Sequence, residues 1–323
     1  MVIGLGSMGR RRIRLIQQNF EGWIICGVDT NESRRIKAEE ELNIATYDDI
    51  DSAILENKFK CALVCTSPLS HNKIIEKCLR SKISVFTEIN LVKVGYDENV
   101  QLAKDNNLLL FLSSSMIYRD EMRYLKNRIS SDKDYFYTYH VGQYLPDWHP
   151  WESYKDFFIG KKETNGCREI LAIELPWIQY VFGEIESISS LNTRVTKLDI
   201  DFSDVFMLLI KHKNGRIGSF VVDVAAYEPV RDLKIIGEKH LIKWEGTPET
   251  LYEKSEFDNK MLNVKLYDKV VHESGYNATI VENEYINELR QFFAELNHQS
   301  TKVYDFEDDK IILSLIDEVE SYT

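Results

Sequence analysis

In the first third of the chain, short apolar runs alternate with amphipathic segments. Three of the runs, at 23–28 (WIICGV), 61–65 (CALVC) and 108–112 (LLLFL), are continuously hydrophobic, as strands buried on both faces are. Strands that alternate with helices predict parallel βαβ units and therefore a doubly wound sheet. The other elements predicted in this part are strands at 1–5 and 84–86 and helices at 8–19, 32–42, 50–56, 71–81 and 97–106.

After about residue 115 the predicted strands are longer and alternate between apolar and polar positions, which is typical of a sheet with one buried face. Lys213, Asn214 and Gly215 predict a hairpin turn between two of these strands. We expect an α+β domain in which a large, mostly antiparallel, open sheet carries helices on one side. The predicted strands lie at 135–141, 185–195, 205–212, 216–224, 233–236 and 241–244, and the predicted helices at 116–129, 282–296 and 307–320.

Composition adds constraints on the class of protein. The length of 323 residues fits two domains, and 44% hydrophobic and 28% charged residues are ordinary for a globular protein. The formal net charge of −12 argues against a nucleic-acid partner, because phosphate binding needs a concentrated basic surface. Five cysteines without zinc-ribbon spacing predict reduced, buried thiols, no metal site and a cytoplasmic location. Without a signal-peptide pattern or about 20 consecutive apolar residues, we expect no membrane partner.

A glycine-rich motif, GLGSMG, follows the first predicted strand and opens the first predicted helix. It matches the GxGxxG fingerprint of dinucleotide-binding folds in the context that the fingerprint requires. Gly4 allows the tight turn, Gly6 lets the backbone approach a pyrophosphate, and Gly9 lets the helix pack close to the sheet. The N–H groups at the start of the helix would hold the phosphates. The cofactor contacts predicted in this loop are Gly4, Gly6, Ser7, Met8 and Gly9.

Asp29 ends the second predicted strand, twenty residues beyond Gly9. A carboxylate at this position, with Thr30 beside it, accepts hydrogen bonds from the adenosine ribose and would repel a 2′-phosphate. We therefore predict NAD as the cofactor. NADP stays an alternative because Arg34 and Arg35 follow closely in the sequence. The other interpretation of the segment is a structural glycine turn with a surface aspartate.

Three segments of the first domain carry a resemblance: VIGLGSMGRR at the N-terminus, the loop 66–68 (TSP) with His71, and 85–88 (VFTE). Together they resemble the glucose–fructose oxidoreductase / inositol dehydrogenase (Gfo/Idh/MocA) family of sugar dehydrogenases. The resemblance implies an NAD(P)-binding Rossmann domain at 1–115 and an α+β domain for substrate binding and oligomerisation at 116–323. It also implies a homodimer or homotetramer. The residues that it places near the ribose and nicotinamide half of the cofactor are Thr66, Ser67, Pro68, His71 and Glu88.

The sequence departs from the family at the positions that transfer protons. The family's Glu-Lys-Pro motif reads Glu88-Ile89-Asn90 here, so the lysine that would polarise the reacting hydroxyl is absent. The family also carries an Asp-x-Gly-x-His-x-x-Asp helix that ends in Phe-Gly-Glu. Counted back from that turn at 182–184, its histidine falls near Ile173 and its second aspartate near Pro176. Because isoleucine neither takes nor gives a proton, any acid–base group has to come from elsewhere.

The segment 142–152 is one candidate source, since it combines two tryptophans, a tyrosine, a histidine and two acids. Aromatic faces with hydrogen-bonding groups between them suit a sugar ring. His149 is a candidate proton carrier as well as a substrate contact. The alternative is an ordered loop whose tryptophans pack on the sheet. The substrate contacts predicted here are Tyr144, Trp148, His149 and Trp151.

A second candidate source is the segment 166–174, in the helix that holds the family histidine. Arg168 would grip a substrate carboxylate or phosphate. Glu169 or Glu174 would serve as a catalytic base if burial raised its pKa, and Glu88 is a stand-in base. The alternative is a charged first helical turn favoured by the helix dipole, with Glu174 in a structural ion pair.

We interpret the chain as an NAD(P)-dependent oxidoreductase that moves a hydride to or from a carbinol or carbonyl carbon of a sugar, nucleotide-sugar or cyclitol. The resemblance, the aromatic loop and Arg168 together favour an anionic sugar of surface-glycan biosynthesis. One alternative is an NAD- and sugar-binding sensor or partner subunit that has lost the proton-transfer residues. Another is a non-redox lyase with tightly held NAD. An ionisable group within about 3 Å of the reacting hydroxyl would distinguish enzyme from sensor.

Overall fold

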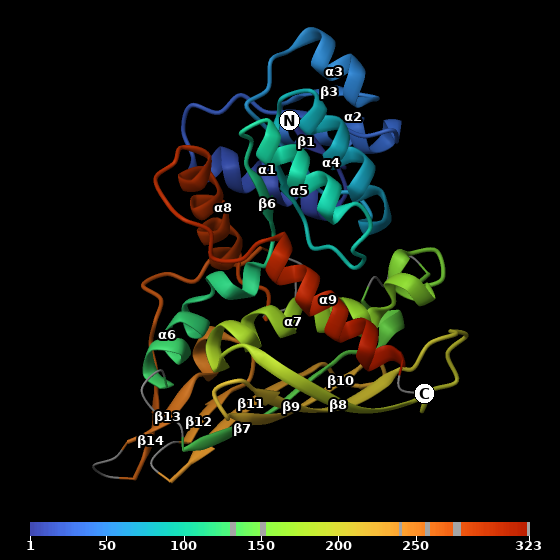
Figure 1. Ribbon diagram of the computed structural model, residues 1–323. Helices are drawn as coiled ribbons and strands as arrows, with labels where there is room; N and C mark the ends of the chain where they lie inside the picture. Colours follow the sequence, from blue (N-terminus) through green and yellow to red (C-terminus); the bar gives the residue numbers. More distant parts are fainter. Residues whose placement is uncertain (130–133, 149–152, 239–240, 256–258, 274–278, 322–323) are drawn as a thin grey trace. The chain divides into compact units, whose positions relative to one another are not determined.

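The computed structural model describes residues 1–129, 134–148, 153–238, 241–255, 259–273 and 279–321. The chain divides into two compact units (Figure 1). The first comprises Met1–Ser114 and Tyr285–Lys310, and the second comprises Ser115–Glu284 and the residues from Ile311 onward. The sequence predicted two uninterrupted segments, whereas the chain returns to the first unit near its end. Phe292 in that returning segment packs against Phe86 and Phe111, which lie in two strands of the first unit.

The first unit is the predicted doubly wound fold. Its six strands are all parallel and lie in the order β3-β2-β1-β4-β5-β6. The hydrophobic pattern did not predict β3, which is short and only partly buried and lacks the apolar run that identified the other strands. The strands are β1 (Val2–Ile3), β2 (Cys26–Val28), β3 (Ala45–Tyr47), β4 (Cys61–Val64), β5 (Ser84–Thr87) and β6 (Leu110–Leu112).

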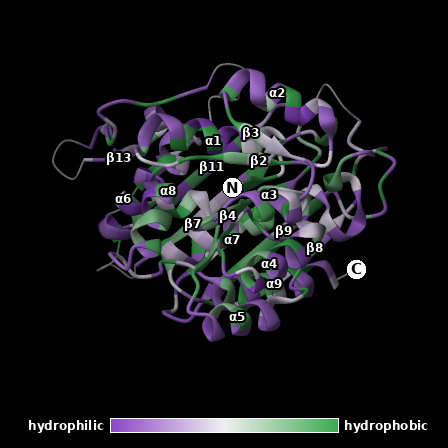
Figure 2. Cartoon of the chain, turned by 90° about the horizontal axis from the view of Figure 1, so that it is seen from above, coloured by the Kyte–Doolittle hydropathy of each residue, from purple (hydrophilic) through white to green (hydrophobic). Residues whose placement is uncertain are grey.

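Helices flank this sheet, and their apolar positions explain how they pack. In the first helix, Ile13 and Ile16 are buried, as their spacing along one face predicts. The outward helix α5 is mostly hydrophilic along its length (Figure 2). The helices are α1 (Ser7–Asn19), α2 (Glu32–Leu42), α3 (Ile50–Glu56), α4 (His71–Arg80), α5 (Tyr96–Asp105) and most of α8 (Glu282–Leu296).

The second unit is built on the predicted large sheet. Its eight strands lie in the order β14-β13-β12-β11-β7-β10-β9-β8, and β7 and β10 form its parallel pair. The predicted hairpin turn joins β9 to β10, with Gly215 in the left-handed region at φ +89°. The strands are β7 (Tyr135–Gly142), β8 (Ile185–Thr193), β9 (Val205–His212), β10 (Ile217–Asp223), β11 (Val230–Gly237), β12 (Leu241–Trp244), β13 (Tyr252–Lys254) and β14 (Met261–Asn263).

The two faces of this sheet differ. Helices α6 (Asp120–Ile129) and α7 (Gly166–Phe182) cover one face (Figure 1), toward which Tyr137 and Tyr139 of β7 point and stack with aromatic neighbours. The alternation of these tyrosines along the strand is therefore sheet packing, as expected. The other face carries exposed apolar side chains on four strands: Phe136, Leu191, Met207, Leu209 and Ile217.

Two predicted helices of this unit differ in detail. The helix expected at 116–129 is interrupted, because Ser115–Tyr118 forms a 3₁₀ turn and α6 begins only at Asp120. The last helix, α9 (Phe306–Ser321), turns Ile312 and Ile316 inward and leaves Ile311 48% exposed. None of the helices in the described ranges is long and apolar enough to span a membrane.

Candidate functional site

The glycine loop joins β1 to α1 and has the backbone geometry that its sequence predicts. Gly4 lies at φ +92°, a conformation that favours glycine, and a Cβ there would lie 2.6 Å from the Cys65 carbonyl oxygen. A Cβ on Gly9 would lie only 1.8 Å from the Gly4 carbonyl oxygen, so glycine is needed for α1 to approach the sheet. Gly6 caps α1 without any side chain, and a Cβ built on it would enter open space. The loop is thus a cradle whose hollow a Cβ would fill, as expected for a pyrophosphate site.

Asp29 is tied directly to this loop. Its Oδ2 accepts a hydrogen bond of 2.8 Å from the Leu5 N–H, and its Oδ1 accepts one of 2.8 Å from the Asn31 N–H. Arg34 and Arg35, because of which NADP stayed an alternative, lie close to Asp29. The Arg34 guanidinium lies 3.8 Å from Asp29 Oδ2, and Arg35 donates to the Asp29 carbonyl oxygen. The neighbouring Thr30 is exposed. A carboxylate at the end of β2 beside the glycine loop fits NAD.

The loop after β4 is held by buried polar contacts. His71, the first residue of α4, has its Nε2 2.9 Å from the Thr66 carbonyl oxygen and its Nδ1 2.7 Å from Oδ1 of Asn90. Burial lowers the pKa of His71, so the ring is neutral at neutral pH. Asn90 occupies the position of the proline in the family's Glu-Lys-Pro motif. His71 therefore orders the loop that contains Ser67 and Pro68.

Glu88 follows β5 and is held in a buried ion cluster. The Arg12 guanidinium of α1 lies 2.6 Å from Glu88 Oε1 and 2.6 Å from Glu288 Oε2. Glu288 also accepts hydrogen bonds from Ser113 and from the Ser114 N–H, and burial raises its pKa to about 7. The Glu88 carboxylate is thus held by a buried arginine. These contacts favour a positioning role for Glu88 over that of a stand-in base.

On α7, Glu169 and Glu174 have contrasting surroundings. Glu169 is half-buried in the first turn, and no hydrogen bond or ion pair of its side chain occurs within the described ranges. Burial raises its pKa to about 7. Glu174 is 1% exposed, lies 2.6 Å from the Arg231 guanidinium, and accepts hydrogen bonds from Tyr139 and Trp177. The structural ion pair considered for Glu174 is thus present, and the structure does not support it as a base.

Arg168 has partners inside its own unit. Asn165 caps the helix by accepting from the Arg168 N–H at 2.8 Å. The guanidinium is paired with Glu320 and, at 2.6 Å, with Asp317, both on α9. Its side chain is 6% exposed. The charge of Arg168 is thus matched by two carboxylates of the protein, and its contact with a substrate anion stays a prediction.

The aromatic loop approaches the start of α7. A Cβ built on Gly166 would lie 3.5 Å from the Trp148 ring and 2.9 Å from the Leu145 side chain, so glycine permits this close packing. Trp148 and Tyr144 are half-buried, and the Trp148 indole donates to the Gln143 carbonyl oxygen. The structure thus brings the two predicted substrate segments together at one helix end. His149 and Trp151 lie outside the described residues.

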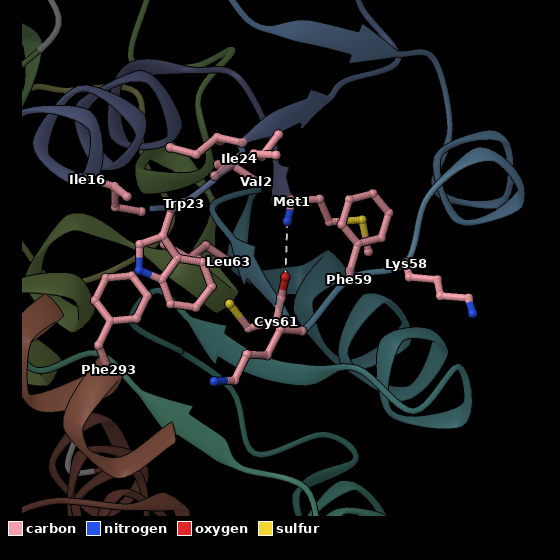
Figure 3. Close-up of a pocket in the computed structure, with 12 residues that line it drawn as sticks. Met1, Val2, Ile16, Trp23, Ile24, Lys58, Phe59, Cys61, Leu63 and Phe293 are labelled. Atoms are coloured by element: carbon pink, nitrogen blue, oxygen red, sulfur yellow. Dashed lines mark hydrogen bonds between the residues drawn. The ribbon is translucent and has the colours of Figure 1, made fainter. Parts of the chain in front are cut away.

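Figure 3 shows a hollow of about 170 Å³ in the first unit, lined by Trp23, Ile24, Phe59 and Phe293 among others. It lies beside Met1 and Cys61, at the amino ends of β1 and β4. In open parallel sheets ligands bind outside the carboxyl ends of the strands, where the glycine loop lies. This hollow is therefore at the wrong end of the sheet for the cofactor.

A parallel Rossmann unit with a glycine cradle, followed by an α+β unit with an open sheet, defines a class of nucleotide-dependent oxidoreductase folds. Residues 1–112 match the oxidoreductase family with an NAD-binding Rossmann fold. Myo-inositol 2-dehydrogenase from Thermotoga maritima is 23% identical over 133 residues, which are 40% of this chain and 40% of that protein. The matched stretch is thus about two fifths of this curated relative.

Two solved structures are similar to the whole chain. An oxidoreductase from Agrobacterium radiobacter, in complex with NAD⁺, L-tartaric acid and magnesium, has a TM-score of 0.84 at 13% identity and covers 99% of this chain and 95% of its own. The WlbA dehydrogenase from Bordetella pertussis, in complex with NADH and UDP-GlcNAcA, has a TM-score of 0.76 at 15% identity and covers 98% and 94%. At these identities the likeness shows the fold.

The comparisons support the predicted resemblance to the Gfo/Idh/MocA family of NAD-binding oxidoreductases, and the match to the family covers residues 1–112. The predicted fold class and the predicted cofactor class are confirmed.

Proposed function

We propose that the protein is an NAD-dependent oxidoreductase that moves a hydride between the cofactor and a carbinol or carbonyl carbon of a sugar, nucleotide-sugar or cyclitol. The glycine cradle and Asp29 support the cofactor part of this proposal. The inositol dehydrogenase and the nucleotide-sugar complex of WlbA support the substrate class.

Glu169 is the observation that carries the catalytic part. A general acid–base is most effective when its pKa lies near the operating pH, and burial raises that of Glu169 to about 7. In the family pattern Asp-x-Gly-x-His, an acidic residue precedes the histidine by four positions. With the histidine position at Ile173, that acidic position is Glu169. The proposal therefore assigns proton transfer to a position that is also acidic in the family pattern.

In this mechanism NAD supplies the hydride acceptor and the chain supplies position and proton transfer. The N-terminal end of α1 would hold the pyrophosphate, and Asp29 would accept hydrogen bonds from the ribose hydroxyls. Glu169, as a carboxylate, accepts the proton of the substrate hydroxyl, and as a carboxylic acid it returns a proton in the reverse direction. Trp148 stacks on the sugar ring near the start of α7.

Ile89 and Ile173 favour a second candidate, because they replace the family's lysine and histidine. A protein that binds NAD and a sugar without turnover would be a sensor or a partner subunit. It would retain the glycine cradle and Asp29 and would not need a titrating Glu169.

We also propose that the protein forms a homodimer or homotetramer through the uncovered face of the second sheet. The exposed apolar residues on β7, β8, β9 and β10 support this interface, since monomers rarely expose contiguous apolar patches. Sedimentation of the protein and of a Leu209→Asp variant tests it: the variant is expected to be monomeric. An unchanged assembly in the variant would contradict this interface.

The experiment that tests the function has two stages. Titration with NADH and NADPH, followed by fluorescence, should show tighter binding of NADH. The NAD-loaded protein is then screened with aldoses, uronic acids, inositols and nucleotide-sugars for absorbance change at the nicotinamide band. Turnover on a member of the panel supports the oxidoreductase, and tight NADH binding without turnover supports the sensor. Failure to bind either nucleotide would contradict both.

A further inference from the structure

Two arginines of the second unit, Arg168 and Arg231, are paired with protein carboxylates. Arg168 pairs with Asp317 and Glu320. Arg231 lies 2.6 Å from Oε1 of Glu174, with a second contact of 3.3 Å to Oε2. Because each guanidinium lies on its own carboxylates, neither offers an unmatched positive charge to a ligand.

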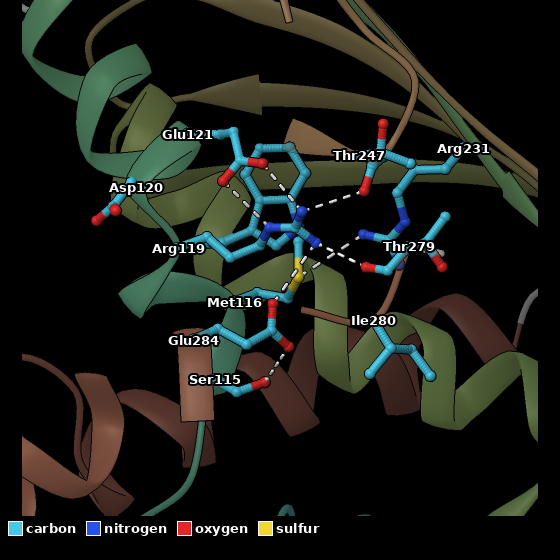
Figure 4. Close-up of polar contacts among 12 residues, drawn as sticks. Ser115, Met116, Arg119, Asp120, Glu121, Arg231, Thr247, Thr279, Ile280 and Glu284 are labelled. Atoms are coloured by element: carbon cyan, nitrogen blue, oxygen red, sulfur yellow. Dashed lines mark hydrogen bonds and ion pairs between the residues drawn. The ribbon is translucent and has the colours of Figure 1, made fainter. Parts of the chain in front are cut away.

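Arg119 belongs to the same set (Figure 4). It lies 2.9 Å from Glu121 and 3.5 Å from Glu284, and it donates to the carbonyl oxygens of Thr279 and Gly246. Burial raises the pKa of Glu284 above its ordinary value. Each of these three arginines therefore lies beside at least one carboxylate of the protein.

Glu169 differs from these carboxylates, because its side chain has no cation beside it in the described ranges. Two unit charges about 4 Å apart repel by about 4 kcal/mol at an effective dielectric constant of about 20. A substrate ring that carries a carboxylate or phosphate would meet this repulsion at Glu169 above neutral pH. A neutral ring would instead donate its hydroxyl protons to the carboxylate.

Trp148 gives the same end of α7 an apolar surface. Its ring packs at Gly166. Glu169 follows Gly166 by three residues, so Gly166 and Glu169 lie on the same face of the helix. An aromatic face beside a hydrogen-bond acceptor suits a polyhydroxylated ring, whose C–H groups stack while its hydroxyls donate. Trp148 and Glu169 provide no positively charged group that would bind an anion.

We infer that the reacting ring of the substrate is neutral, and that the site discriminates against rings bearing a carboxylate or a phosphate. The inference rests on the proposed function and narrows its substrate class. It differs from the anionic sugar expected from the sequence, an expectation drawn from the resemblance, the aromatic loop and Arg168 together. A diphosphate further from the reacting ring is compatible with it, because the charge preference concerns only the ring at Glu169.

Matched pairs of probes test the inference, because their members differ in the charge of the ring. The pairs are D-glucose with D-glucuronate, and UDP-GlcNAc with UDP-GlcNAcA. Calorimetric affinity for the NADH-loaded protein and kcat/KM with NAD⁺ are measured for each member at pH 6 and pH 8.5. We expect at least a tenfold preference for a neutral member at pH 8.5, which is about 1.4 kcal/mol. The preference should fall at pH 6, where Glu169 is protonated.

Two variants separate the sources of the preference. Glu169→Gln should reduce the preference measured by calorimetry, since it removes the repelling charge. Arg168→Gln should leave the preference unchanged, because its guanidinium serves Asp317 and Glu320. Asp317→Asn, at a half-exposed position, is a milder probe of the same pair if Arg168→Gln does not fold.

Three results would overturn the inference. The first is an acidic ring bound as well as its neutral partner at pH 8.5. The second is a loss of acidic-ring binding alone in Arg168→Gln, or a gain of it in Asp317→Asn, since either would make Arg168 an anion ligand. The third is no binding of any pair by protein that does bind NADH, which would contradict the proposed substrate class as well. A preference for the acidic ring would overturn the inference but would leave the oxidoreductase proposal intact.

Discussion

The glycine loop of the first unit and the first turn of α7 in the second show two different ways in which a sequence determines a site. In the loop, main-chain geometry decides: Gly4 and Gly9 are required by a left-handed φ and by a close approach. At α7, side-chain partners decide. Glu169 and Glu174 are the same residue type on the same helix, yet only Glu174 has an arginine beside it. The backbone site can be identified from local sequence, whereas the side-chain site depends on distant partners.

Replacing Glu169, the acid of α7 that has no arginine beside it in the described part of the chain, should have the largest effect. Glu169→Gln should lower kcat by roughly 10²–10⁴-fold, the usual contribution of a general acid–base, with NADH affinity unchanged. In the oxidation direction the wild-type rate should rise as pH increases through about 7, since the carboxylate is the active base, and the variant should lack this rise. Steady-state kinetics between pH 5 and 9 measures both.

Glu163→Gln, at an exposed position shortly before α7, is the matched control and should retain wild-type kinetics. A Glu169→Gln variant with the wild-type rate and pH profile would remove Glu169 from the mechanism and return the search to the segment 149–152.

The buried pair on the same helix should respond through stability. Glu174→Gln leaves the Arg231 guanidinium without its carboxylate, which costs about 3–5 kcal/mol for a buried pair. Glu186→Gln, in an exposed pair with Lys211, should cost less than about 1 kcal/mol. Urea unfolding of both variants measures the difference. Equal, small losses would mean that the Glu174 pair contributes no more than a surface ion pair, and the contrast with Glu169 would disappear.

Substitutions at two glycines of the loop distinguish an effect on folding from an effect on cofactor binding. Gly9→Ala places a Cβ on the Gly4 carbonyl oxygen and should lower both Tm and NADH affinity, since α1 has to move. Gly6→Ala meets no protein atom within 4 Å and should leave Tm unchanged. It should still weaken NADH at least tenfold, about 1.4 kcal/mol, because the pyrophosphate needs that space. Unchanged NADH binding in Gly6→Ala would show that the cradle is a structural turn only.

These contrasts explain which parts could be predicted from the sequence. Continuous apolar runs located β2, β4 and β6, and their alternation with helices predicted the doubly wound fold. The short, partly exposed β3, β13 and β14 carry no such signal. The departures from the family at Ile89 and Ile173 follow from their spacing to a motif, and they stay predictions.

The partners of the site residues could not be predicted. Glu88 is paired with Arg12, which is 76 residues away, and Glu174 with Arg231, which is 57 residues away. Arg168 meets Asp317 at a separation of 149 residues. No local pattern encodes such pairs, because they arise only when strands and helices distant in sequence pack together. For this reason the sequence predicted a substrate contact for Arg168, whereas in the structure its guanidinium pairs with carboxylates of α9.

The smallest expected effect tests the surroundings of Glu169 without a substrate. Its pKa in the folded chain is about 7 against an ordinary value of 4.5, so folding favours its protonated form. The stability that this form contributes is present below about pH 4.5 and is lost as pH rises through 7. Glu169→Gln removes this titration and should match the wild type near pH 4.5. By pH 8.5 it should be more stable by about 1 kcal/mol, given partial solvent screening, which is a Tm higher by roughly 2–4 °C. A Tm difference that stays constant across this range would mean that Glu169 titrates as an ordinary surface acid, and α7 would then hold no distinct acid–base group.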